Sequence, residues 1–132
     1  MEDKKEQILK GAKVIAVVGL SDNPEKPSYR VAKYMQGQGY RIIPVNPTIS
    51  EVLGERAYKS LRDIPEKVDI VDVFRRSEDV PPVAEEAISI KAGTLWMQQG
   101  IVNEEAQRRA ESAGLQVVMD CCIMVEHRQI KR

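Results

Sequence analysis

The chain has 132 residues, of which 42% are hydrophobic and 30% charged, so it has enough apolar material for one compact domain and does not resemble a disordered polymer. Its 20 basic and 20 acidic residues leave no net charge, which argues against a dedicated nucleic-acid binder. The longest strongly apolar stretch, Val14 to Leu20, is far shorter than the roughly 20 residues of a membrane span. The charged start, residues 1–7, has no apolar region typical of a signal peptide. We therefore expect a single soluble, cytoplasmic domain over residues 1–132, with neither a nucleic-acid nor a membrane partner.

Cysteine and histidine are too few to build a metal site or a disulfide framework. The two cysteines, Cys121 and Cys122, are adjacent, and adjacent cysteines cannot close a loop. His127 is the single histidine, so a zinc site lacks a further ligand. A nucleophilic Cys122–His127 pair requires both groups within hydrogen-bond reach, which the sequence does not favour. We expect His127 at the surface and the charged tail, Arg128 to Arg132, to be frayed or solvated.

Five short apolar runs alternate with stretches of helical spacing. The runs are Lys13–Val18, Arg41–Val45, Asp69–Val73, Thr94–Met97 and Gln116–Asp120. Most are rich in valine and isoleucine and are continuously apolar, as is typical of strands buried on both faces of a sheet.

The stretches between these runs predict helices. Ser28–Gln38 and Glu78–Lys91 place apolar residues on one stripe, and a glycine follows each of them. Asn103 is a good N-cap for a third helix. Thr48–Glu66 is less regular, and we expect there a short element that packs on the sheet without forming a full crossover helix.

Strands that alternate with helices indicate right-handed crossovers and a parallel sheet. We predict an α/β fold, a three-layer Rossmann-like sandwich with a five-stranded, mainly parallel sheet in the order 3-2-1-4-5. Ligands of such sheets bind beyond the carboxyl ends of the strands, at the switch point beside the first strand. Chemistry is therefore expected at this edge.

The first predicted strand ends in a turn followed by a helix N-terminus, a combination that suits a phosphate. Glycine in this turn allows close approach to a ligand, while the free N–H groups and the positive dipole end of the helix favour an anion. Two cations and two hydroxyls are placed to assist. The candidates are Gly19, Leu20, Ser21, Lys26, Pro27, Ser28 and Arg30. The structural alternative is that Gly19 only forms a turn and Ser28 only caps the helix.

The pattern departs from an ordinary NAD site. Ser21 stands at the second glycine position of G-x-G-x-x-G, and no third glycine follows. The second predicted strand ends in Asn46, where NAD sites normally have an acidic residue for the ribose hydroxyls. The fold therefore favours a nucleotide, whereas these details speak against NAD.

Other strand ends carry further candidates. Phe74, after the third run, suits either a core position or a wall of the cleft. Arg75 is suited to stacking on a base or pairing with phosphate, although Arg75 and Arg76 equally suit a solvated pair. Gln98 follows the fourth run as a plausible amide contact. Cys122 follows the fifth, where it either faces the cleft or is buried as a small hydrophobe.

Seven short motifs, taken in order, resemble the family of stand-alone CoA-binding domains. They are Gly19-Leu20-Ser21-Asp22-Asn23-Pro24, Lys26-Pro27-Ser28-Tyr29, Gly39-Tyr40, Pro44-Val45-Asn46-Pro47, Val73-Phe74-Arg75-Arg76, Leu95-Trp96-Met97-Gln98 and Asp120-Cys121-Cys122. The chain is also similar to the N-terminal CoA-binding domain of the succinyl-CoA synthetase alpha subunit. The resemblance covers about residues 8–127. Each motif is weak alone, but the ordered set is specific.

The resemblance implies a CoA-binding Rossmann-like domain and assigns roles to individual residues. It places the ADP phosphates at Gly19, Leu20, Ser21, Pro27, Ser28, Tyr29 and Arg30. It places the nucleotide end beside Val45, Asn46 and Pro47, the border of the cleft at Val73, Phe74 and Arg75, the pantetheine path near Gln98, and the CoA thiol near Cys122. Thr48 and Cys121 depart from the pattern, because relatives often have basic residues there.

Binding without catalysis is the function that these observations favour. His127 does not match the phosphorylated histidine of the synthetase, so no ligase reaction is implied. We expect the chain to bind CoA or acyl-CoA as a carrier, sensor or accessory protein. A homo-oligomer and a complex with a partner enzyme are the assemblies that fit this role. The alternatives are an NAD(P)-binding redox sensor or oxidoreductase, a mixed disulfide between Cys122 and CoA, and a scaffold role.

Overall fold

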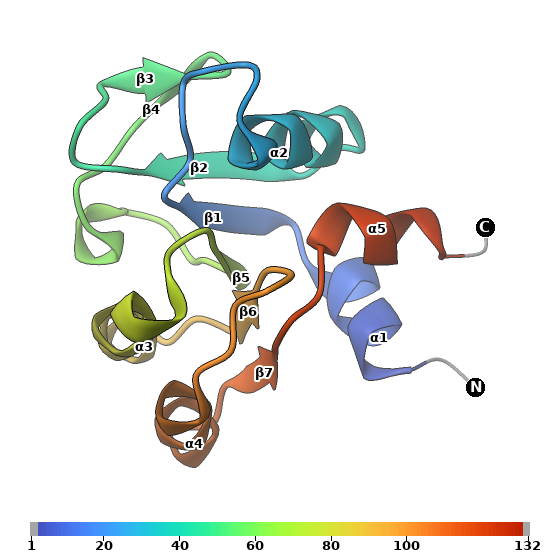
Figure 1. The fold of residues 1–132 in the computed structure, drawn as a ribbon, viewed down its shortest axis with the longest axis vertical. Helices are drawn as coiled ribbons and strands as arrows, with labels where there is room; N and C mark the ends of the chain where they lie inside the picture. Colours follow the sequence, from blue (N-terminus) through green and yellow to red (C-terminus); the bar gives the residue numbers. More distant parts are fainter. Residues whose placement is uncertain (1–2, 131–132) are drawn as a thin grey trace.

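A computed structural model describes residues 3–130 of the chain and shows a five-stranded parallel sheet (Figure 1). Its strands, in spatial order, are β2 (Arg41–Val45), β1 (Val14–Val18), β5 (Ile70–Val73), β6 (Thr94–Met97) and β7 (Gln116–Val118). A separate antiparallel hairpin consists of β3 (Glu51–Val52) and β4 (Glu55–Arg56). The five predicted strands are confirmed, and the irregular stretch after β2 contains the hairpin.

Helices cover both faces of this sheet (Figure 1). One face is covered by α1 (Lys4–Gly11), α2 (Pro27–Gly37) and α5 (Ile123–Arg128). The other is covered by α3 (Val80–Ser89) and α4 (Glu104–Ser112). Single 3-10 turns lie at η1 (Leu61–Asp63) and η2 (Ser77–Asp79). The three-layer Rossmann-like fold class is thus confirmed.

The position of the third predicted strand needs correction. The order 3-2-1-4-5 placed the run 69–73 outside the second strand, but β5 pairs with β1 on its other side. The outer edge of β2 carries Tyr58 instead, which forms an isolated parallel bridge with Val45. The N–H of Tyr58 donates to the Pro44 carbonyl at 2.9 Å, and its carbonyl accepts from the Asn46 N–H at 2.9 Å. The expected order places a strand at the outer edge of β2. At that position the structure has only the bridge at Tyr58, which is too short to form an apolar run.

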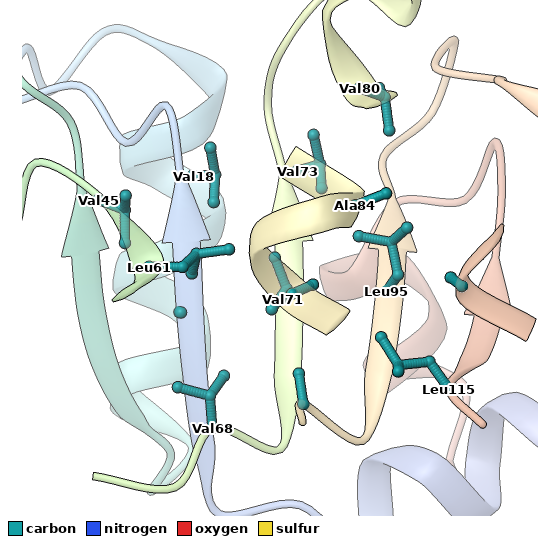
Figure 2. Close-up of a cluster of buried hydrophobic side chains, with 14 of the residues drawn as sticks. Val18, Val45, Leu61, Val68, Val71, Val73, Val80, Ala84, Leu95 and Leu115 are labelled. Carbon is teal, nitrogen blue, oxygen red and sulfur yellow. The ribbon is translucent and has the colours of Figure 1, made fainter. Parts of the chain in front are cut away.

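Strand residues alternate between two cores, which explains why the strands are apolar throughout. Figure 2 shows one cluster, in which Val71 and Val73 of β5 and Leu95 of β6 lie beneath Val80 and Ala84 of α3. On the opposite face, the buried residues of the sheet pack against α1, α2 and α5. The sheet is therefore covered on both faces. The loops that follow the strands start at its carboxyl edge.

Two helices were not predicted, because they are short and depend on contacts distant in sequence. In α1, the Asp3 side chain accepts a hydrogen bond from the Glu6 N–H at 2.8 Å and caps the helix. In α5, His127 is only 8% exposed, so the expected surface position is wrong. Its Nδ1 lies 2.9 Å from the Tyr34 hydroxyl, because α5 folds back onto α2. Arg128 belongs to α5 with an exposed side chain, and residues 131–132 of the expected tail lie outside the described part.

Within residues 3–130, no helix has the length and apolar character needed to cross a membrane.

Candidate functional site

The turn after β1 brings the backbones of three strands together. Gly19 has a φ of +88°, and its N–H donates to the Val45 carbonyl at 2.8 Å. The N–H of Phe74 donates to the Val18 carbonyl at 2.8 Å. A Cβ at Gly19 would collide with the carbonyl oxygen of Phe74. Glycine is thus required both by the backbone conformation and by the close approach of the β5 end.

Hydrogen bonds from backbone N–H groups to side-chain and backbone oxygens fix the loop from Ser21 to Lys26. Ser28 Oγ accepts from the Ser21 N–H at 3.0 Å, and Ser21 Oγ accepts from the Asn23 N–H at 3.0 Å. The N–H of Lys26 donates to the Asn23 carbonyl at 3.0 Å. The Ser28 side chain is buried, and its hydroxyl fixes the loop against α2. Contrary to the structural alternative, Ser28 does not cap the helix, because the cap residue is Lys26.

The N-terminus of α2 is open to a ligand. Lys26 is the cap residue, yet its side chain makes no capping hydrogen bond, and Pro27 in the first turn has no N–H to donate. Helix geometry gives the N–H groups of Ser28 and Tyr29 no partner within the helix. The exposed Lys26 and Arg30 flank this end. The arrangement suits an anion, with backbone donors, helix dipole and side-chain charge in one place.

Asn46 connects the end of β2 to the turn after β1. Its Nδ2 donates to the Leu20 carbonyl at 3.0 Å, and its Oδ1 accepts from the N–H and the hydroxyl of Thr48 at 3.0 and 2.8 Å. Leu20 and Val45 are buried, so their side chains belong to the core and only their backbone lies at the edge. Pro47 is exposed beside them.

The two arginines after β5 differ in their surroundings. Arg76 Nε lies 3.1 Å from Asp79 Oδ2, in an exposed ion pair. Arg75 instead reaches over the β1 turn, since its Nε would lie 3.4 Å from a Cβ placed on Gly19. Phe74 is half-buried on the α2 side of the sheet, whereas Val73 is buried on the α3 side. Of the pair, Arg75 is the one positioned at the candidate phosphate site.

The ends of β6 and β7 hold the start of α5. Gln98 is 4% exposed, and its Oε1 accepts from the Ile123 N–H at 3.0 Å. The indole N–H of Trp96 donates to the Cys121 carbonyl at 2.9 Å. Cys122 is the half-buried cap residue of α5. Cys121 lies with its Sγ 3.9 Å from Lys5 Nζ, and burial is the main cause that raises the pKa of its thiol.

Sequence reasoning missed Asp72, the most unusual polar residue near this edge. It is 1% exposed, and its Oδ1 has no hydrogen-bond partner within the described structure. Burial raises the pKa of this carboxyl well above its ordinary value. The sequence does contain an indication, because Asp72 is the single charged residue in the interior of a strand predicted to be buried on both faces.

Metal ligands do not gather at this site. Across residues 3–130, no group of three or more histidine, cysteine, aspartate or glutamate side chains is arranged to hold a metal ion.

Together, the parallel sheet, the glycine turn and the helix N-terminus beside it define a Rossmann-like α/β domain whose carboxyl edge carries groups that suit an anion. Residues 13–128 match the model of the CoA binding domain, and the chain therefore belongs to the CoA-binding domain family. The resemblance found in the sequence motifs is confirmed.

Relatives include both short proteins and much longer enzymes. YneT, an uncharacterized protein of Bacillus subtilis, is 54% identical over 121 residues, which are 92% of this chain and 90% of that protein. A solved structure from Thermus thermophilus, described as cell-free ID.343, shares 40% identity with a TM-score of 0.92 and covers 98% of both chains. The ADP-forming acetate–CoA ligase II of Archaeoglobus fulgidus is 32% identical over 103 residues, which are 75% of this chain but 15% of the ligase.

Proposed function

We propose that this chain binds CoA or an acyl-CoA at the carboxyl edge of its sheet. The open N-terminus of α2 beside the Gly19 turn is the observation that carries the proposal. A diphosphate there would accept hydrogen bonds from the N–H groups of Ser28 and Tyr29 and lie between the charges of Lys26 and Arg30. Membership of the CoA-binding domain family supports CoA as the source of that diphosphate.

The remaining edge residues divide between the two ends of such a ligand. Val45, Asn46 and Pro47 would border the nucleotide, with Arg75 above the phosphates. Gln98 and Cys122 would lie toward the pantetheine arm. Because Gln98 Oε1 already accepts from the Ile123 N–H, its role is to position α5, and its amide nitrogen is the part left for a ligand. Asn46 offers no carboxylate for a ribose, which favours CoA over NAD.

The proposed activity is binding without catalysis. The arrangement at the edge contains backbone donors, cations and a buried carboxyl, but no nucleophile held by a base. The histidine is engaged with Tyr34 at the far end of α5. A carrier, a sensor or an accessory protein that presents CoA to a partner enzyme fits this site. Similarity to part of ADP-forming ligases supports an enzyme partner of that kind.

Calorimetric titration of ligand-stripped protein with CoA, acetyl-CoA and NAD tests the proposal. We expect micromolar or tighter binding of the CoA species and weak binding of NAD. Arg30→Glu should weaken CoA binding at least several-fold, because it places a negative charge at the diphosphate site. Arg108→Glu, an equal charge reversal on exposed α4, is the matched control and should bind as the wild type. Preference for NAD, binding of neither ligand, or equal effects of both variants would overturn the proposal.

A further inference from the structure

Asp72 lies at the centre of the sheet, close to its carboxyl edge. It pairs in register with Val17 of β1 and Trp96 of β6, and it precedes the last residue of β5. Val17 and Trp96 belong to the core on the side of α1, α2 and α5. Since paired residues of neighbouring strands face the same side, the Asp72 carboxyl points into that core. It lies on the sheet face covered by α2, whose N-terminus forms the proposed diphosphate site.

This carboxyl lacks the partners that buried polar groups normally have. Oδ1 makes no hydrogen bond with any described residue, and no ion pair links Asp72 to a described cation. Burial raises its pKa well above the usual range, which favours the uncharged acid. An uncharged carboxyl offers an O–H donor and a free acceptor oxygen. Such an orphaned group in a folded protein calls for an explanation, of which an absent ligand is one.

The strand positions beyond Asp72 lead to the proposed ligand edge. Two residues further along, on the same side, are Gly19 after β1, Phe74 after β5 and Gln98 after β6. Gly19 contributes no side chain, and Gln98 Oε1 is occupied by the Ile123 N–H. Gly19, Phe74 and Gln98 therefore lie at the carboxyl edge of the sheet. Asp72, with its unpaired Oδ1, lies two residues further inside on the same face.

We propose that Asp72 forms a hydrogen bond with the pantetheine arm of the bound ligand. This inference rests on the proposed function, because it requires a CoA-type molecule with its diphosphate at α2. The arm carries two amide groups, each with an N–H donor and a carbonyl acceptor, and Asp72 has both complementary functions. To reach the carboxyl, the arm displaces Phe74, which is half-buried above it.

Two ligands and two variants separate this role from a structural one. CoA contains the arm, whereas adenosine 3′-phosphate 5′-diphosphate contains the complete nucleotide, with its diphosphate, and lacks the arm. Asp72→Leu removes both hydrogen-bonding functions at similar size, and Asp72→Asn retains a donor and an acceptor. By calorimetry, we expect Asp72→Leu to bind CoA about 3- to 10-fold more weakly than wild type and the arm-free nucleotide equally well. Asp72→Asn should bind both within about 2-fold of wild type.

A spectroscopic readout checks contact with the acid itself. The carbonyl stretch of the protonated Asp72 carboxyl should shift in difference infrared spectra when CoA is added, and Asp72→Asn should lack this band. Asp72→Leu is expected to fold, because it removes an unpaired buried polar group, and thermal unfolding will verify this.

The outcomes separate failure of the proposed Asp72 contact from failure of the proposed function. Wild-type affinity of Asp72→Leu for CoA, or an equal loss for both ligands, overturns the contact with the arm. Equal wild-type affinities for CoA and the arm-free nucleotide would do the same, because the arm would then contribute nothing. If wild type binds neither ligand, the proposed function itself fails.

Discussion

The side-chain amide of Asn46 donates a hydrogen bond to the carbonyl of Leu20 at 3.0 Å, and so connects the end of β2 to the turn after β1. The same side chain accepts two hydrogen bonds from Thr48. Asn46 therefore has a structural role at a position where a dinucleotide site would need an acidic residue for the ribose. An acid cannot replace it, because a carboxylate would face the Leu20 carbonyl with no proton to donate.

Asn46→Asp tests this role. The loss of the donor should lower the free energy of unfolding by about 1–2 kcal/mol and weaken CoA binding, without creating affinity for NAD. Urea unfolding and calorimetry measure the two effects. Thr48→Ala is the control, since it removes one accepted bond and leaves the Asn46–Leu20 bond intact. If Asn46→Asp unfolded like wild type and gained NAD binding, the structural role would be refuted.

Gly19→Ala should destabilise the fold by more than its backbone conformation alone explains. Gly100 is a suitable comparison, because its φ of +85° nearly equals the +88° of Gly19, yet no atom lies within 4 Å of a Cβ placed there. Gly100→Ala should cost about 1–2 kcal/mol for the left-handed conformation. Gly19→Ala adds the collision with the Phe74 carbonyl and should cost clearly more. Equal costs in denaturant unfolding would show that the β1 and β5 ends separate easily.

Most of the fold follows from local patterns in the sequence. Continuous valine and isoleucine runs predict the buried strands, and Asn103 caps α4 as expected, with its Oδ1 accepting from the Ala106 N–H at 2.9 Å. The strand order does not follow, because the residue at the outer edge of β2 is Tyr58, within a loop without strand character. The helices α1 and α5 escape prediction because their stability comes from contacts between distant segments, such as Lys5 with Glu126 at 3.2 Å.

The candidate site is predictable to a similar extent. The position of Gly19 and the helix after it follow from the general placement of ligands at the carboxyl edge of parallel sheets. The sequence does not reveal that Ser28 fixes the loop, that Gln98 holds α5, or that Arg75 and Arg76 diverge. These roles depend on side-chain directions that only the assembled edge defines. Asp72 is predictable in part. The sequence shows a charged residue within an apolar run, but it does not show that the carboxyl lacks a hydrogen-bond partner.

Asp72 gives the protein a pH-dependent stability. Burial raises the pKa of the Asp72 carboxyl in the folded state. Its contribution to the free energy of unfolding is therefore fully present below the unfolded pKa of about 3.9 and is lost as pH rises toward the folded pKa. Asp72→Asn has no proton to lose. We expect the variant to exceed wild type in Tm by a few degrees at pH 7, and the difference to shrink as pH falls from 7 to about 4 and to stay small below that.

Asp22→Asn is the control for this pH series, because Asp22 is exposed in the loop before α2. Its difference from wild type should stay small at every pH, within about 0.5 kcal/mol. A constant difference between Asp72→Asn and wild type from pH 4 to pH 7 would mean that the Asp72 carboxyl is charged in the folded protein. It would then need a cationic or water partner.

We expect the contact between His127 and Tyr34 to help hold α5 over the sheet. The two rings are edge-to-face with centroids 5.5 Å apart, and the ring of Tyr40 is also edge-to-face with the imidazole, with centroids 5.7 Å apart. Tyr34→Phe removes the hydroxyl and keeps the ring, so we expect a loss of about 1 kcal/mol in unfolding free energy. His127→Ala also removes the packing and should cost about 2–4 kcal/mol.

Hydrogen exchange localises this effect. If the contact fastens α5, both variants should accelerate exchange of the α5 amides more than those of α3, which lies on the opposite face of the sheet. Tyr29→Phe removes a hydroxyl from a half-buried tyrosine elsewhere on α2 and should leave α5 protected. Because Gln98 and Trp96 bind the start of α5, a loosened helix should also weaken binding of the pantetheine arm, which links the far end of α5 to the ligand edge. Uniform acceleration over the whole chain would instead mean that His127 contributes to global stability alone.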